Sequence, residues 1–283
     1  MMHFNHRRAT SIKARAGQYL DDDQLRAVAP SIFATEAHES RSARFAPVPT
    51  FNVLEGLRAE GFEPVFAAQS RSRDESKRDF TKHMLRLRHR GESVPAVGDE
   101  AFEIVLINAN DGTSAYKMLP GVFRLVCLNG LMVGDTYDEV KVRHSGNAIS
   151  DVIEGAYRVL NEAPKVHNQI AEFKNLALSD GARQAFAEAA HILRFPDKAP
   201  EDVPVTAGGL IRPRRSADTA RDLWTTFNVA QENVIRGGQR GRIIGADGRR
   251  RNASVREVAG IDQNRALNRA LWTLTERMAQ LVA

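Results

Sequence analysis

The side chains in this sequence that could do chemistry are mainly cationic, and they gather in two segments. Residues 71–90 hold eight Arg and Lys residues against three Asp and Glu, which gives a local net charge of +5. Residues 236–256 hold seven Arg residues against Asp247, a local net charge of +6. Together they exceed the net charge of +5 of the whole chain, so the remainder is slightly acidic. Positive charge clustered in this way predicts a site for a polyanion.

The candidate contacts to nucleic-acid phosphates come from both segments. They are Arg71, Arg73, Lys77, Arg78, Lys82, Arg86, Arg88 and Arg90 in the first, and Arg240, Arg242, Arg249, Arg250 and Arg251 in the second. Phe80 lies among them and is a candidate to stack on a base. The alternative is that these charges solvate two hairpins and keep their strand edges from aggregating. Either segment alone fits both interpretations, whereas the presence of two favours a binding function.

The usual catalytic and cofactor motifs do not occur in the sequence. It has no phosphate-binding Gly-x-x-x-x-Gly-Lys-Ser/Thr, no dinucleotide Gly-x-Gly-x-x-Gly, no Gly-x-Ser-x-Gly and no His-Glu-x-x-His. His83 and His89 have no carboxylate or cysteine spaced to complete a metal site. Cys127 lies in an apolar run, which predicts a buried thiol and not a nucleophile. We expect no catalytic residue, metal or cofactor, although an active site assembled from distant residues stays open.

Length and composition are those of an ordinary globular protein. The chain has 283 residues, 42% of them hydrophobic and 27% charged, which allows one large domain or two. A single cysteine favours a reducing compartment. No apolar stretch reaches the roughly 18–20 residues of a membrane span, and the N-terminus lacks the apolar region of a secretory signal. We therefore expect a cytoplasmic protein.

Residue periodicity predicts an α+β fold, in which a mainly antiparallel sheet is flanked by helices. The expected strands are 62–69, 80–89, 102–109, 115–119, 122–128, 131–133 and 140–144. The basic strand within 80–89 is expected to be half exposed, with leucines on its other face. The expected helices are 50–60, one from about 148 to 160, 165–178, 180–195, 217–235 and 263–281, with Thr50, Ser216 and Asp262 as caps.

Four parts follow from this pattern. Residues 1–47 are expected to form an arm or a small subdomain, 48–196 the α+β core, 197–215 a linker or loop, and 216–283 a helical C-terminal region with a basic hairpin loop at 240–258. Trp224 and Trp272 are expected to pack the last two helices on each other.

The run Phe123-Arg-Leu-Val-Cys-Leu-Asn-Gly-Leu131, with Val133-Gly134 after it, resembles a signature of the phage- and plasmid-like family called domain of unknown function 932. Near the end, Leu223-Trp-Thr-Thr-Phe-Asn228, Gln231-Glu-Asn233, Gly237-Gly238 and Asn268-Arg-Ala-Leu-Trp272 are similar to the same family. The resemblance covers roughly residues 45–283. It implies a mobile-element context and brings no catalytic residues. The order of elements from residue 50 also resembles, at fold level only, single-strand annealing proteins of the RecT/Redβ type.

Three functions are compatible with these observations. The first is a non-catalytic protein of a phage or plasmid that binds single-stranded DNA or RNA, as a homo-oligomer, for strand annealing or anti-defence. The second is an interaction factor, an oligomeric inhibitor of a host defence protein. The third is a metal-dependent nuclease with a dispersed acidic site. Salt-sensitive, sequence-independent binding favours the first, and dependence on a divalent metal favours the third.

Overall fold

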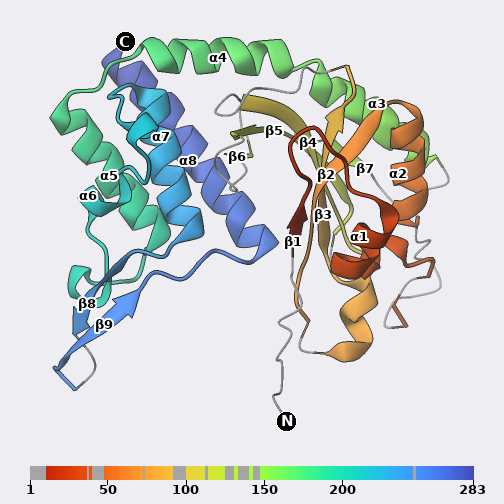
Figure 1. Ribbon diagram of the computed structural model, residues 1–283, viewed down its shortest axis with the longest axis horizontal. Coiled ribbons are helices and arrows are strands. Elements are labelled where there is room, and N and C mark those ends of the chain that lie inside the picture. Colours follow the sequence, from red (N-terminus) through yellow and green to blue (C-terminus); the bar gives the residue numbers. More distant parts are fainter. Residues whose placement is uncertain are drawn as a thin grey trace. The chain divides into compact units, whose positions relative to one another are not determined.

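The computed structural model describes residues 11–36, 38–39, 48–72, 74–91, 100–111, 114–124, 131–132, 140–142, 147–244 and 247–283 (Figure 1). The chain forms two compact units. The first comprises residues 1–126 and 137–162, and the second comprises 127–136 and 163–283. The sequence placed the end of the α+β core at residue 196, whereas the structure divides the chain after residue 162.

An antiparallel sheet forms the centre of the first unit. Its strands are β1 (Ser11–Lys13), β2 (Phe62–Gln69), β3 (His83–His89), β4 (Glu100–Asn108), β5 (Tyr116–Arg124) and β7 (Val140–Val142). They lie in the order β1-β2-β3-β4-β5, and β7 also pairs with β5. In the middle of the sheet Leu85 lies opposite Ala67 on one side and Leu106 on the other. The two segments expected at 115–119 and 122–128 are joined, as far as Arg124, in the single strand β5.

The N-terminal residues that the structure describes are part of this unit and not a loosely attached arm. β1 pairs with β2, and the chain continues through helix α1 (Asp22–Val28) and the 3-10 turn η1 (Pro30–Phe33). Leu25 and Ile32 in these two elements are fully buried. Asp21 caps α1 by accepting a hydrogen bond from the backbone N–H of Gln24 at 2.8 Å. Although this segment is polar in composition, it packs into the core of the first unit through Leu25 and Ile32.

Two helices, α2 (Thr50–Ala59) and α3 (Ala148–Leu160), pack on one face of the sheet (Figure 1). The left-handed φ of +89° at Gly61 lets the chain leave α2 and enter β2 directly. A side chain at Gly155 of α3 would meet Met118 of β5 at 2.2 Å, so glycine allows this helix to lie close to the sheet. The sequence prediction that Thr50 caps α2 is wrong, because Thr50 is its first residue and no side chain caps it.

The hydroxyl of Thr50 instead joins a buried polar network centred on His83. Nδ1 of His83 lies 2.8 Å from Oγ of Ser31, and its Nε2 lies 2.9 Å from Oγ1 of Thr50. Ser31 donates its own proton to Oε1 of Gln69 at 2.8 Å, so it accepts from His83. Asn108 donates to the same Thr50 oxygen at 2.9 Å. These bonds tie η1, α2 and three strands together, and burial lowers the pKa of His83 from 6.5 to about 4.

The second unit is mainly helical. It contains α4 (Ala163–Asn175), α5 (Asp180–Arg194), α6 (Ala207–Leu210), α7 (Leu223–Arg236) and α8 (Ile261–Val282), the short turns η3 (Pro200–Asp202) and η4 (Ser216–Asp218), the strand β6 (Leu131–Met132) and the hairpin β8 (Arg240–Ile244) and β9 (Arg250–Ser254). Asp222 caps α7, and Gly260 precedes α8, so Ser216 and Asp262 are not the N-caps expected from the sequence.

An aromatic cluster holds the helices of this unit together. The ring of Trp272 in α8 lies edge-on to Trp224 and Phe227 of α7, at centroid distances of 6.4 and 6.0 Å, and 5.6 Å from Phe173 of α4. Its indole N–H donates to Oε1 of Glu276 at 2.8 Å, so the one polar atom of this buried ring is satisfied. The prediction that Trp224 and Trp272 pack the last two helices on each other is confirmed.

The α+β class predicted from the sequence is confirmed by this arrangement of strands and helices. Cys127 and the turn at Asn129-Gly130 lie outside the residues that the structure describes, so the predicted burial of the thiol stays a prediction.

The buried His83 predicts an acid-sensitive fold. Because its folded-state pKa of about 4 lies below the ordinary 6.5, the unfolded state binds more protons between these values. The stability that neutral His83 contributes is complete above pH 6.5 and is lost as the pH falls towards 4, about 3 kcal/mol in all. Urea unfolding at a series of pH values measures this. His83→Gln should flatten the fall in unfolding free energy over that range, and equal slopes for both proteins would contradict the assignment.

Candidate nucleic-acid interface

Two arginines of the first basic segment are buried inside the first unit. Arg86 and Arg88 of β3 have relative exposures of 3% and 6%, and both bind the carboxylate of Glu103 on β4. Nε of Arg86 donates to Oε2 and Nη2 of Arg88 donates to Oε1, each at 2.6 Å. A buried guanidinium group needs such a partner because it has lost its hydration. These two side chains are therefore not available to bind phosphates at the surface.

The expectation that β3 is half exposed is wrong for the same reason. Both faces of the strand are buried from His83 to Arg88, and only His89 at its end is partly accessible. The guanidinium group of Arg86 also lies 5.1 Å from the ring centroid of Phe66 on the neighbouring strand. The alternation of basic and leucine residues here marks two buried faces, of which one is occupied by ion pairs.

The remaining cations of the first segment lie among acidic residues. Arg71 and Arg78 are exposed and Lys77 is half buried, but Asp74 and Asp79 are exposed in the same stretch. Lys82 is half buried as well, and Arg73 lies outside the described residues. Arg90 is exposed and binds the buried carboxylate of Glu63. Because Arg86 and Arg88 are buried, the surface of this segment carries both positive and negative side chains.

Phe80 has a neighbour within the protein. Its ring packs edge-on against His38, with centroids 5.4 Å apart, and its side chain is half buried. The prediction that it stacks on a base is untested, but stacking requires that this packing be given up.

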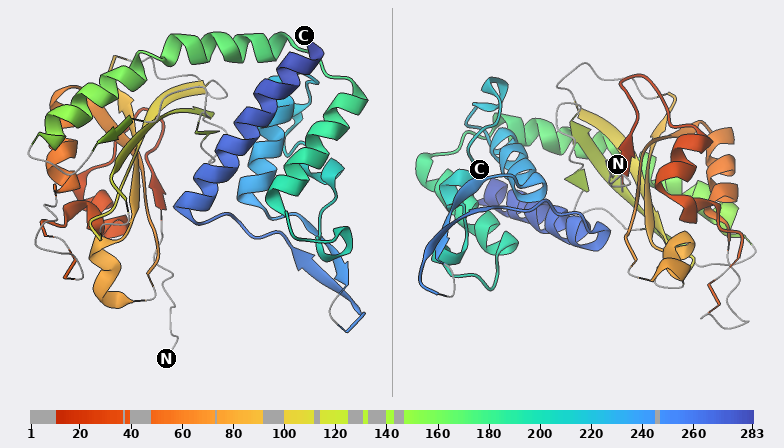
Figure 2. Two further views of the ribbon diagram at one scale, coloured as in Figure 1. Left: turned by 180° about the vertical axis from the view of Figure 1, so that it is seen from behind. Right: turned by 60° about the horizontal axis from the view of Figure 1, so that its bottom comes forward.

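The second basic segment forms the antiparallel hairpin of β8 and β9. Arg240 lies opposite Ser254, Arg242 opposite Asn252 and Ile244 opposite Arg250. These six residues share one face, because side chains alternate along a strand. All six are exposed, whereas Gly241, Ile243 and Ala253 between them are half buried. Figures 1 and 2 show the hairpin extending away from the helices of its unit. The face that carries three of the arginines is the outward one.

The inward face rests on the segment 197–215, which was expected to be a linker or loop. A side chain at Gly241 would meet the carbonyl oxygen of Pro204 at 2.0 Å, so glycine is required for the strand to lie this close. The neighbouring residues Glu201 and Asp202 are exposed. The covering segment thus brings acidic residues close to β8. Arg240, Arg242 and Arg250 occupy the outer side, whereas Arg251, opposite Ile243, belongs to the inner one.

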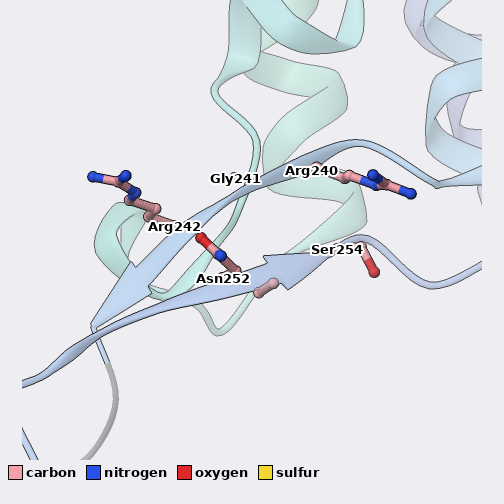
Figure 3. Close-up of a pocket in the computed structure, with 6 residues that line it drawn as sticks. Arg240, Gly241, Arg242, Asn252 and Ser254 are labelled. Atoms are coloured by element: carbon pink, nitrogen blue, oxygen red, sulfur yellow. The ribbon is translucent and has the colours of Figure 1, made fainter.

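The outward arginines are not neutralised within the protein. In the described part of the chain no carboxylate forms an ion pair with Arg240, Arg242, Arg249 or Arg250. A pocket of about 680 Å³ on the hairpin is lined by Arg240, Gly241, Arg242, Asn252, Ala253 and Ser254. In Figure 3 the guanidinium groups of Arg240 and Arg242 point towards opposite ends of the hairpin. Positively charged and hydrogen-bonding groups therefore face solvent together, as a site for anions requires.

Arg251 differs from the other arginines of the hairpin because it has a carboxylate partner. Its Nη2 donates to Oδ2 of Asp247 in the turn at 2.8 Å, and both side chains are exposed. This hydrogen bond lowers the pKa of Asp247, and so does the backbone N–H of Arg249, which donates to its Oδ1 at 3.2 Å.

Asn233, near the end of α7, fixes the base of the hairpin. Its side-chain amide donates to the carbonyl oxygens of Leu210 and Arg212, and its Oδ1 accepts from Nε of Arg214 at 2.7 Å. Its backbone carbonyl accepts from the side chain of Gln239, one residue before β8. Segment 210–214 is thereby packed on α7, so residues 197–215 are part of the second unit and not a free linker.

Glycine makes the turn from α7 into the hairpin possible. Gly237 has a φ of +62°, and a side chain there would lie 2.7 Å from the backbone oxygens of Val255 and Arg256. The next residue, Gly238, donates its N–H to Val255 at 2.8 Å, and Nη2 of Arg194 donates to the carbonyl oxygen of Arg256 at 2.8 Å. Hydrogen bonds therefore fix the backbone at both ends of the hairpin, at Gly238 before β8 and at Val255 and Arg256 after β9.

Two other polar side chains of α7 are buried and paired. Glu232 binds Arg215 and Arg236, and Gln231 donates to Oδ1 of Asn268 in α8 at 2.8 Å. The run Gln231-Glu232-Asn233 thus connects α7 to three other parts of its unit. These roles, and that of Glu103, were not predicted from the sequence. A carboxylate inside the apolar run Phe102–Ala109 was the available signal, since a buried acid requires a cationic partner.

The described residues include neither a cluster of metal ligands nor a helix that could span a membrane. Among the described residues, no group of three or more His, Cys, Asp and Glu side chains could hold a metal ion. No helix in the described part of the chain is long and apolar enough to cross a membrane.

Comparison with known proteins gives a family and close relatives. A family model described as Domain of unknown function (DUF932) matches residues 37–272. The UPF0380 proteins YafZ and YfjQ of Escherichia coli (strain K12) are each 45% identical to the chain over 264 residues, which is 93% of this chain and 93% of each relative. No solved structure matches. The fold-order resemblance to single-strand annealing proteins therefore stays a prediction.

The ion pairs in the sheet predict a large effect of Glu103 on stability. Glu103→Gln removes the carboxylate charge that both Arg86 and Arg88 bind, which should lower the unfolding free energy by about 3–5 kcal/mol. Chemical denaturation measures this change. Glu55→Gln is the matched control, since Glu55 is exposed and its half-buried partner Arg58 keeps Asp22 as a second partner, so the loss should cost less than about 1 kcal/mol. Equal stabilities of the two variants would show that Glu103 is not the buried counter-charge.

Proposed function

The chain belongs to the family described as domain of unknown function 932, and we propose that it is a non-catalytic protein that binds single-stranded nucleic acid. The site of binding is the outward face of the hairpin β8–β9. The observation that carries this proposal is the set of exposed arginines on that face without ion pairs inside the described structure. Such cations release condensed counterions when they meet phosphates, and this release drives sequence-independent binding.

The arrangement of the arginines suits a chain of phosphates better than a single phosphate group. Arg240 and Arg242 alternate with Gly241 along β8, so their Cα atoms lie about 6.8 Å apart. Their guanidinium groups point apart in Figure 3, so each would bind a different anion. Arg250 adds a third cation at the far end of the same face, diagonally across from Arg242. A flexible single strand can place successive phosphates against three such points.

Base recognition is not part of the proposed interaction. No aromatic side chain occurs in residues 236–256, so the hairpin offers no ring on which a base could stack. Asn252 and Ser254 add neutral hydrogen-bonding groups beside the cations. Binding should therefore depend on salt and on the number of phosphates, and only weakly on the sequence of the strand.

Self-association and a cytoplasmic location complete the proposal. Proteins that bind single strands without sequence preference commonly bind cooperatively along the strand, as an oligomer does. Strand annealing would require such binding, and the family resemblance implies the mobile-element context in which annealing or anti-defence would act. A single cysteine in 283 residues is consistent with the reducing cytoplasm.

An acidic protein is the second candidate partner, because the same exposed arginines can pair with carboxylates. An inhibitor of a host defence protein could use the hairpin in that way. The absence of aromatic side chains from residues 236–256 fits this candidate as well. The two partners differ in their predicted behaviour towards oligonucleotides.

A fluorescence polarisation titration with labelled oligo-dT at several salt concentrations tests the proposal. The logarithm of the association constant should fall linearly with the logarithm of salt concentration, by about 0.7 for each phosphate contacted. Arg240→Ala/Arg242→Ala/Arg250→Ala should weaken binding at least tenfold and reduce the slope by about 2, since three contacts are lost. Mixed-sequence strands should behave like oligo-dT.

The matched control removes the same number of charges from the first segment. Arg71→Ala/Lys77→Ala/Arg78→Ala should change affinity much less, because Asp74 and Asp79 already offset those cations. Thermal unfolding should show that both triple variants remain folded. Absence of binding to any oligonucleotide at about 50 mM salt by folded wild-type protein would overturn the proposal in favour of a protein partner. Equal losses in the two triple variants would show that the hairpin is not the specific site.

A further inference from the structure

The turn of the hairpin contains a carboxylate in a segment that is otherwise basic. Asp247 is the only acidic residue between positions 236 and 256. Its two oxygens have different partners: Oδ1 accepts from the backbone N–H of Arg249 at 3.2 Å, and Oδ2 accepts from Nη2 of Arg251 at 2.8 Å. One oxygen thus shapes the turn, and the other holds an arginine.

Only the first of these two contacts is needed for the turn. A side-chain oxygen that accepts from the backbone N–H two residues later forms a local turn that asparagine makes as well as aspartate. Gly248, with a φ of +72°, supplies the left-handed residue next to it. The negative charge of Asp247 therefore has no structural task in the turn that a neutral amide could not perform.

The charge of Asp247 does, however, form an ion pair with Arg251. Arg251 and Asp247 have relative side-chain exposures of 62% and 40%, so their ion pair lies in water at the tip of the hairpin. Exposed ion pairs are weak, and a phosphate can replace the carboxylate as the partner of the guanidinium group.

We infer that Asp247 is a counter-charge that limits the affinity of the hairpin for nucleic acid by holding Arg251 away from the phosphates. This inference rests on the proposed function, since Arg251 belongs to the same hairpin, where it lies opposite Ile243 and therefore on the other face from Arg242 and Arg250. In the free protein Asp247 offsets one cation of the tip. In the complex Arg251 leaves Asp247 and binds phosphate, so each binding event includes the loss of this ion pair.

Asp247→Asn separates the two roles, because the amide oxygen can still accept from Arg249 while the charge is gone. The variant should bind oligo-dT about two- to fivefold more tightly than wild type at 50 mM salt, which is the fold-change expected from an exposed ion pair. Its salt slope should equal that of wild type, because Arg251 contacts phosphate in both complexes and only the ion pair of the free protein is missing. Thermal unfolding checks that the turn is intact.

Arg251→Ala and the double variant Asp247→Asn/Arg251→Ala complete a cycle that isolates the pair. The inference expects the gain from Asp247→Asn to vanish when Arg251 is absent. A gain of the same size in both backgrounds would overturn it, because Asp247 would then only repel the strand. No gain in Asp247→Asn, while wild type binds and the Arg240/Arg242/Arg250 triple variant does not, would overturn it and leave the proposed function standing. No binding by any of these proteins would overturn both.

Discussion

A guanidinium group can leave water only where a carboxylate or several carbonyl oxygens receive it, and this requirement determines which arginines of the chain reach the surface. Arg86 and Arg88 are accommodated in the sheet by Glu103, and Arg215 is held on α7 by Glu232. Arg194 and Arg214 are held by backbone oxygens around the base of the hairpin. The outward arginines of β8 and β9 have no such partner in the described structure, so their charge is left to solvent or to a ligand.

The polar residues of α7 fix the position of the hairpin that carries these arginines. Asn233 binds the backbone of segment 210–214 and, through Gln239, the start of β8. Gly237 and Gly241 permit the close approaches that keep the hairpin against its own unit. A buried polar group pays for its desolvation only when its bonds are complete, so these contacts define one position for the base of the hairpin. The arginines are therefore presented on a defined face, and only the turn beyond them carries a neutralising acid.

Much of the fold was predictable because it depends on local patterns. Alternation and apolar runs located β2, β4, α2, α3, α4, α5 and α8 to within a few residues, whereas α1 and α6 were not predicted and α7 begins six residues later than expected. The predicted contact of Trp224 with Trp272 is also present. The site was only partly predictable, because the sequence does not show which charges pair across strands. Arg86 and Arg240 look equally available in a list of cations, yet one binds a buried acid on the neighbouring strand and the other lies on an outward face. Glu103 and Asn233 act through partners that are distant along the chain, and periodicity carries no information on such pairs.

The central claim is that the outward face of the hairpin, and not the basic strand of the sheet, receives the polyanion. Amide hydrogen exchange of the full chain, measured with and without saturating oligo-dT at low salt, locates the contact directly. The account predicts slower exchange in residues 240–254 on binding, with exchange in residues 83–89 unchanged. Protection confined to residues 71–90, with none in the hairpin, would contradict it.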